Sequence, residues 1–189
     1  MAVAYFKRYR MELQIDRSRP IGADLPRPPQ GFRVLPWTPR LLNQHADVKW
    51  MSFREELDAH VFPCLSQREG CRHLMREIVG RTDFVPEATW LVVRENSFTN
   101  QWQPCGTIQG LLSGSREGAI QNIGVHPECR GLGLGTVLVA YAVDGFKEVD
   151  CQSVNLEVTV ENSSAIRLYE RLGFRRVETL FKISETQIA

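Results

Sequence analysis

The segment His126–Val143, HPECRGLGLGTVLVAYAV, constrains the fold more than any other part of the chain. Its glycines at 131, 133 and 135 follow Arg130 directly, and an apolar pattern of helical spacing begins among them. Glycine weakens both helices and strands, so these positions indicate a turn with unusual backbone angles or a close approach of another group. Backbone N–H groups at a helix N-terminus lack intrahelical partners and lie at the positive end of the dipole. The segment therefore predicts a site for a phosphate or pyrophosphate.

Three phosphate-binding motifs compete for this segment. The P-loop pattern fails because no lysine follows the glycines, and the dinucleotide fingerprint fails because Thr136 replaces its last glycine. The pattern R-x-x-G-x-G fits fully, from Arg130 to Gly135. The guanidinium of Arg130 adds a fixed charge and a planar fork that suits phosphate oxygens. A turn that only eases packing between a strand and a helix is the alternative that remains open.

The rest of the chain predicts a mixed sheet with helices on both faces, α/β or α+β in class. Apolar and polar residues alternate from Tyr9 to Ile15, which is typical of a half-buried strand. A proline-rich loop over 17–31 and a second strand from Phe32 follow. The remaining expected elements are helices over 39–80, 133–146 and 162–173, a hairpin over 87–95 and 105–114, and strands over 119–125, 153–160 and 175–183. The length of 189 residues suits a single domain over 1–189.

Composition narrows the classes of partner. The net charge of +1 provides no overall field toward nucleic acid or an anionic membrane. No apolar run approaches the roughly 20 residues that span a bilayer, and the start of the chain lacks a secretory core, so a cytoplasmic location is expected. The five cysteines are scattered and odd in number, which argues against a disulfide framework. Cys64, Cys71 and His73 lack the spacing of a metal site, so no metal is expected.

Two separated motifs, NIGVHPECRGLGLGTVLV and NLEVTVENSSAIRLYERLGF, resemble the GNAT superfamily of acetyl-CoA-dependent N-acetyltransferases in order and spacing. The resemblance covers Ala119 to Phe174 firmly and the first eighty or so residues hardly at all. It implies a GNAT-like, mostly antiparallel sheet of six to seven strands, flanked by helices and splayed at an acetyl-CoA site. It also implies transfer of an acetyl group to a primary amine of a protein N-terminus, a lysine or a small molecule. The helical region 39–80 would lie on the acceptor side.

The resemblance further implies how coenzyme A is held, between the diverging ends of the strands over 119–125 and 154–158. Backbone groups of one strand would bind the pantetheine arm, and Gly124 would form a bulge that starts the splay. Backbone amides of the glycine loop would bind the pyrophosphate. Asn162 matches a family position that contacts the cofactor and can equally be a helix cap. The implied cofactor-binding residues are Ile123, Val125, Arg130, Gly131, Leu132, Gly133, Gly135, Thr136 and Asn162.

Two residues are candidates for the chemistry of acetyl transfer. Tyr169, in RLYERLGF, matches the family's tyrosine general acid, which would protonate the departing thiolate; the alternative is a core tyrosine. Glu157 aligns with the glutamate proposed as general base in the ribosomal-protein alanine N-acetyltransferases. A surface glutamate, with water as the proton acceptor, is the alternative. Gln121 and Asn122 stand where some members of the family hold an acidic residue.

The expected partners are acetyl-CoA and an amine acceptor, either a small molecule or a peptide, with a homodimer as a further option and neither nucleic acid nor membrane. An acidic cluster, Glu55, Glu56 and Asp58, lies in the acceptor-side region and could attract a cationic amine; the commoner use of such a run is a solvated helix face. A catalytically inactive acyl-CoA sensor or structural module is the main alternative function. Nucleotide binding at the same turn is a third, disfavoured by the failed motifs.

Overall fold

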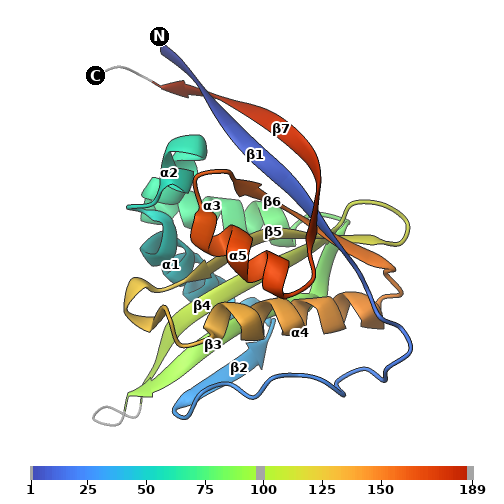
Figure 1. Ribbon diagram of the computed structural model, residues 1–189. Coiled ribbons are helices and arrows are strands. Elements are labelled where there is room, and N and C mark those ends of the chain that lie inside the picture. Colours follow the sequence, from blue (N-terminus) through green and yellow to red (C-terminus); the bar gives the residue numbers. More distant parts are fainter. Residues whose placement is uncertain (1, 97–100, 187–189) are drawn as a thin grey trace.

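The computed structural model describes residues 2–96 and 101–186. Seven strands form one sheet in the order β2-β3-β4-β5-β6-β1-β7 (Figure 1). The strands are β1 (Ala2–Gln14), β2 (Phe32–Pro36), β3 (Phe84–Asn96), β4 (Gln101–Leu112), β5 (Glu117–Val125), β6 (Ser153–Thr159) and β7 (Arg175–Thr186). Neighbouring strands run antiparallel, except that β5 and β6 are parallel. The expected mostly antiparallel α/β sheet is therefore confirmed.

Helices cover both faces of the sheet. On one face lie α1 (Leu42–Phe53), α2 (Leu57–Val61) and α3 (Arg68–Val79), and on the other α4 (Leu134–Glu148) and α5 (Ser163–Arg171) (Figure 1). Short 3-10 turns precede α1, α3 and the glycine loop, namely η1 (Pro39–Leu41), η2 (Pro63–Ser66) and η3 (Pro127–Cys129). The helix α3 ends at Val79 and Gly80 caps it, as the sequence predicted.

The main hydrophobic core lies between the sheet and the pair α4 and α5. Leu138 and Phe146 of α4 and Met11 of β1 are fully buried in it. Gly145 allows the backbone of α4 to contact that of β3, because a Cβ there would lie 1.9 Å from the carbonyl oxygen of Glu87. Burial of the apolar face of α4 against the sheet therefore stabilises the side of the sheet on which the glycine loop lies.

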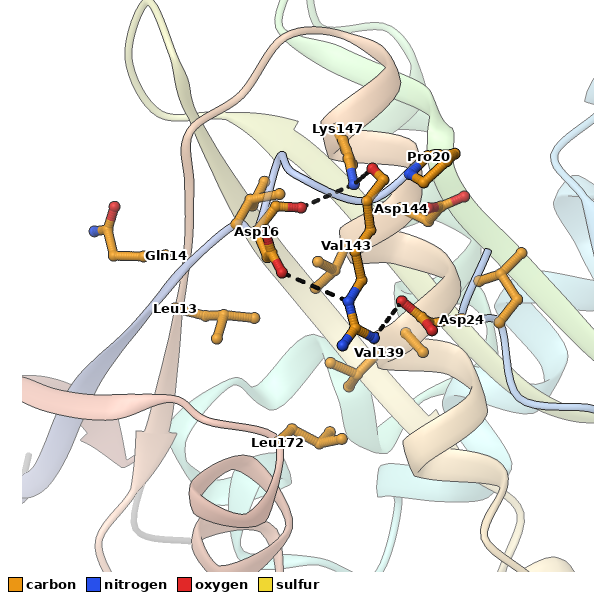
Figure 2. A pocket seen from close by; sticks show the side chains of 14 residues that line it. Leu13, Gln14, Asp16, Pro20, Asp24, Val139, Val143, Asp144, Lys147 and Leu172 are labelled. Carbon is orange, nitrogen blue, oxygen red and sulfur yellow. Dashed lines mark hydrogen bonds and ion pairs between the residues drawn. The ribbon is translucent and has the colours of Figure 1, made fainter. Parts of the chain in front are cut away.

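The proline-rich segment is fastened onto α4. The Lys147 ammonium donates to the carbonyl oxygens of Asp16 and Arg19, and Asp144 accepts from the N–H of Gly22 at 3.0 Å. Arg19 pairs with Asp24 at 2.8 Å and with Asp16 at 3.7 Å, beside a cavity of about 310 Å³ whose lining Figure 2 shows. Each of the charged side chains of this cavity is already engaged by the segment or by α4. These contacts therefore fix the proline-rich segment against α4.

The strands β5 and β6 pair only over four residues, from Glu117 with Ser153 to Ile120 with Leu156, and they diverge beyond. Beyond that point β5 still pairs with β4 and β6 still pairs with β1. The expected bulge at Gly124 is wrong: the register of β5 shifts at Gln121, which the pairing with β4 skips. Gly124 instead makes room for α1, because a Cβ there would lie 2.8 Å from the Cβ of Ser52.

Candidate active site

A cavity of about 380 Å³ lies where β5 and β6 diverge. Its floor is formed by the backbone and side chains of Ala119–Ile123 and Asn155–Val158. Tyr169 reaches it from α5, and Lys182 reaches it from β7. Apolar side chains line it from the face of α1, α2 and α3, namely Phe53, Phe62, Leu65 and Leu74. The split sheet thus provides a slot with strand edges on two sides and an apolar wall on the third.

The glycine loop provides a row of free donors beside α4. Gly131 and Gly133 have φ of +76° and +80°, angles that an L side chain rarely adopts, and a Cβ on either would meet open space within 4 Å. Within the described residues, the N–H groups from Gly131 to Gly133 find no acceptor. Those of 134–136 begin α4 and have no intrahelical partner. These donors at a positive helix end fit a diphosphate.

Gly133 and Gly135 are required for different structural reasons. Gly135 lies inside the first turn of α4, where a Cβ would lie 3.0 Å from the side chain of Leu168 on α5. Gly135 therefore permits the contact between the two helices, whereas Gly133 gives the turn its left-handed angle. Leu132 is half exposed between them, so the loop presents its backbone without an apolar cover.

Arg130 is engaged in the structure by other parts of the chain. Its guanidinium donates to the carboxylate of Glu56 at 2.6 Å, to the carbonyl of Ser52 at 3.0 Å and to the carbonyl of Val125 at 3.2 Å. These contacts tie the glycine loop to the end of α1 and to the α1–α2 connection. Direct binding of a phosphate by Arg130 stays a prediction, and it would require the contact with Glu56 to open.

The open edge of β5 presents backbone groups of Ile123 and Val125, which were predicted from the sequence to bind the cofactor. The N–H of His126 donates to the carbonyl of Cys105 on β4. Because alternate residues of a strand direct their backbone groups to opposite edges, Val125 and Ile123 direct theirs away from β4. The β6 strand no longer pairs with β5 there, so this edge is available to an extended ligand.

Tyr169 is buried at the end of the cavity, with its ring 5.9 Å from that of Phe174. Burial, with a smaller contribution from Asp58, raises the pKa of its phenol well above the ordinary value, against a lowering by Arg8. The hydroxyl therefore keeps its proton at neutral pH and can donate it. Tyr169 lines the cavity from the C-terminal half of α5, and its role as general acid stays a prediction.

Glu157 lies on the rim of the cavity, with its side chain about half exposed. Its Oε2 lies 3.3 Å from Nε of Arg8, without the alignment of a hydrogen bond. Arg8 is 6% exposed and donates to Thr159 Oγ1 at 3.0 Å and to the carbonyl oxygen of Glu157 at 3.1 Å. It also approaches Asp58 at 3.5 Å. Arg8 therefore joins β1, β6 and α2 next to the candidate base.

Sequence reasoning missed Arg8. The alternation that predicted the first strand begins only at Tyr9, and no motif of the chain includes residue 8. The strand β1 extends further toward the N-terminus, and the sheet order places β1 beside β6. The only feature of the sequence that could have indicated Arg8 is its charge, just before the alternating segment that begins at Tyr9.

The acidic cluster of the acceptor side is neutralised by arginines. Glu55 pairs with Arg54 at 3.2 Å, and Glu56 pairs with Arg130. Asp58 accepts from Thr159 at 2.9 Å and faces Arg8. The cluster is therefore not a free negative patch, and on this side the cavity is lined by apolar side chains together with Asp58 and Cys64.

Asn162 caps α5, as the sequence predicted: its Oδ1 accepts from the N–H of Ala165 at 3.2 Å. It also lines the cavity, so a contact with the cofactor stays a prediction. The described part of the chain holds no group of three or more side chains suited to a metal ion. No helix within it is long and apolar enough to cross a membrane.

Known proteins are similar to this chain in sequence and in fold. The model of the acetyltransferase (GNAT) family matches residues 50–174. N-alpha-acetyltransferase 30 of Saccharomyces cerevisiae is 35% identical over 101 residues, which are 51% of this chain and 57% of that protein. The N-alpha-acetyltransferase of Sulfurisphaera tokodaii is 42% identical over 66 residues, 34% of this chain and 40% of that protein. These matches thus span roughly half of the relatives' own length.

Solved structures are similar over most of the chain. A chain of the NatC complex bound to Gag peptide and CoA has a TM-score of 0.63 and 25% identity, covering 82% of this chain and 97% of that one. The ribosomal-protein-S18-alanine N-acetyltransferase of Escherichia coli has a TM-score of 0.55 and 14% identity, covering 84% and 96%. The second likeness shows the fold alone.

Proposed function

Because the chain belongs to the acetyltransferase (GNAT) family, we propose that it transfers an acetyl group from acetyl-CoA to a primary amine. The observation that carries the proposal is the row of unpartnered N–H groups from Gly131 to Thr136 beside a split sheet. Such donors suit the diphosphate of coenzyme A, and the open edge of β5 suits its extended pantetheine arm. When bound, acetyl-CoA supplies the acetyl group as an activated thioester.

The residues around the cavity have separate tasks. The backbone of the glycine loop holds the diphosphate, and the edge at Ile123 and Val125 orients the pantetheine arm. Tyr169 holds a proton at its hydroxyl for the departing sulfur, in a site that its burial keeps protonated. Glu157, through the carboxylate oxygen that Arg8 does not face, takes the proton of the amine.

We take the acceptor to be the α-amine of a protein N-terminus whose first side chains are apolar. Two relatives bear the name N-alpha-acetyltransferase. The cavity wall formed by Phe53, Phe62, Leu65 and Leu74 suits apolar side chains, and the neighbouring acids are already paired with arginines. All five cysteines are free, which suits a reducing compartment, and we place the protein in the cytoplasm.

Calorimetry and thiol release test the proposal. Acetyl-CoA is expected to bind, whereas ATP and NAD bind far more weakly because neither has a pantetheine arm for the open edge of β5. Free CoA thiol should then appear with peptides that begin with apolar residues, and more slowly with lysine side chains, polyamines or aminoglycosides. Binding without thiol release from any amine would replace the enzyme by an acyl-CoA-binding module.

Replacing Glu157 by glutamine is expected to lower kcat/KM for the amine about 10²-fold, at the lower end of the usual range for general bases. A glutamine cannot accept the proton, so the loss should be greatest on the acidic limb, where the amine itself is mostly charged. The measurement is a pH–rate profile from pH 6 to pH 9. Glu161→Gln is the matched control, because Glu161 is exposed just beyond β6 and lies outside the cavity. An unchanged profile for Glu157→Gln would assign the proton to water.

A further inference from the structure

A buried lysine lies directly behind the cavity. Lys49 of α1 is fully buried, and its Nζ donates to the side-chain Oδ1 of Asn122 at 2.9 Å. Asn122 is half-buried on β5 and lines the cavity. Two residues further along β5, Gly124 faces Ser52 and Phe53 of α1, so Asn122 also directs its side chain toward the acceptor side. The pair thus connects the buried side of α1 with the cavity.

The charge of Lys49 determines which end of the Asn122 amide faces it. An ammonium is a donor only, whereas an amide has one accepting oxygen and one donating nitrogen. The oxygen of Asn122 must therefore face Lys49, and its Nδ2 must face away. Within the described residues Nδ2 of Asn122 donates to no protein group. It is also not one of the fully buried polar atoms that lack a partner, so it keeps some contact with solvent. Its N–H groups are therefore available to a ligand in the cavity that Asn122 lines.

We propose that Lys49 is a positioning residue, which fixes the Asn122 amide so that Nδ2 donates a hydrogen bond to a carbonyl oxygen of the acceptor peptide. This inference rests on the proposed acetyl transfer to a peptide amine, because only a peptide acceptor brings a carbonyl next to the reacting amine. A hydrogen bond at this point sets the register of the peptide backbone without contacting the reacting atoms.

The surroundings of Lys49 make this orientation dependent on pH. The groups that face it are His45 one turn earlier on α1, Cys64 of η2, Cys71 of α3 and Asn122 of β5. Burial lowers the pKa of Lys49 to about 7 and that of His45 to about 3, and it raises the pKa of Cys71 to about 11. Near neutral pH, Lys49 is therefore the group among these that titrates.

Deprotonation gives Lys49 a lone pair, so the neutral amine can accept a hydrogen bond as well as donate one. The amide of Asn122 can then turn its Nδ2 toward Lys49 and its oxygen toward the acceptor. The KM of the wild-type protein for an acceptor peptide is thus expected to rise as the pH increases above 7.

Steady-state kinetics with two variants test the inference. The substrate is the peptide from which the thiol-release assay gives the fastest acetyl transfer. Lys49→Met keeps the bulk of the side chain and removes the donor, while Asn122→Asp keeps an oxygen for Lys49 and replaces the Nδ2 donor. Each should raise the KM for the peptide about fivefold to tenfold, the value of one hydrogen bond, with little change in kcat or in the KM for acetyl-CoA. In Lys49→Met the rise of the peptide KM above pH 7 should disappear. Lys7→Met, an exposed position on β1 outside the cavity, is the matched control.

Urea unfolding provides a readout apart from activity. Between pH 7 and pH 10 the unfolded chain holds a proton on Lys49 that the folded chain has lost, so stability rises with pH across this range. Lys49→Met should lack this rise. If the variants lose stability while the peptide KM and its pH dependence stay at the wild-type values, Lys49 is only structural and the inference is wrong. If the wild-type protein acetylates other amines but no peptide, the proposed peptide acceptor and this inference both fail, whereas acetyl transfer itself stands.

Discussion

Replacing Tyr169 by phenylalanine is expected to lower kcat for acetyl transfer about 10²-fold, within the usual range for a general acid, and to leave the KM for acetyl-CoA nearly unchanged. Phenylalanine keeps the ring that packs against Phe174 and removes only the hydroxyl, so the fold and the cofactor site are preserved. The departing thiolate would then leave without a proton. Release of CoA thiol, followed at saturating peptide, gives the measurement.

Tyr141→Phe is the matched control. Tyr141 lies on α4 with its ring 5.1 Å from that of Trp90, away from the cavity. Its hydroxyl has no task in the proposed chemistry, so kcat should stay at the wild-type value. The raised pKa of Tyr169 also predicts that activity persists at high pH, because its phenol ionises only above the ordinary value of about 10. An unchanged kcat in Tyr169→Phe would remove the tyrosine from the mechanism.

Gly145→Ala is expected to destabilise the protein by about 3 kcal/mol, at the upper end of typical overpacking effects. Helix propensity alone predicts the opposite sign, because alanine is better than glycine inside a helix by up to about 1 kcal/mol. Packing prevails here: the new Cβ would lie 1.9 Å from the carbonyl oxygen of Glu87 and 2.8 Å from the backbone nitrogen of Ala88. Backbone atoms of a strand cannot rotate away as a side chain can, so α4 must move.

Urea unfolding measures this effect, and Gly114→Ala is the matched control. A Cβ at Gly114 would make only ordinary contacts, at 3.7 Å from the Cβ of Glu117, and its φ lies outside the left-handed region. The control should stay within about 0.5 kcal/mol of the wild-type stability, as surface substitutions usually do. A Gly145→Ala protein that is as stable as the wild type would show that α4 has room to shift from β3.

The order of strands and helices could be predicted from the sequence, because each element has a local pattern. The alternation after Tyr9 predicted β1, and Gly80 marked the end of α3. The spacing around Tyr169 predicted α5, with Asn162 as its cap. The glycine loop was recognisable too, since its left-handed turn and the helix start lie within a few neighbouring residues. Periodicity and capping act over one or two turns, so a single sequence reveals them.

The partners of the site residues were decided by the tertiary structure. The sheet order places β1 next to β6, and only this brings Arg8 to Thr159 and Glu157 across some 150 positions of the chain. The packing of α1 on β5 buries Lys49 against Asn122 and excludes a side chain at Gly124. The bulge at Gln121 also depends on how β5 pairs with β4. These contacts join residues that share no local pattern, so the sequence by itself determined the elements and the donor loop, whereas the folded sheet decided which charges meet at the cavity.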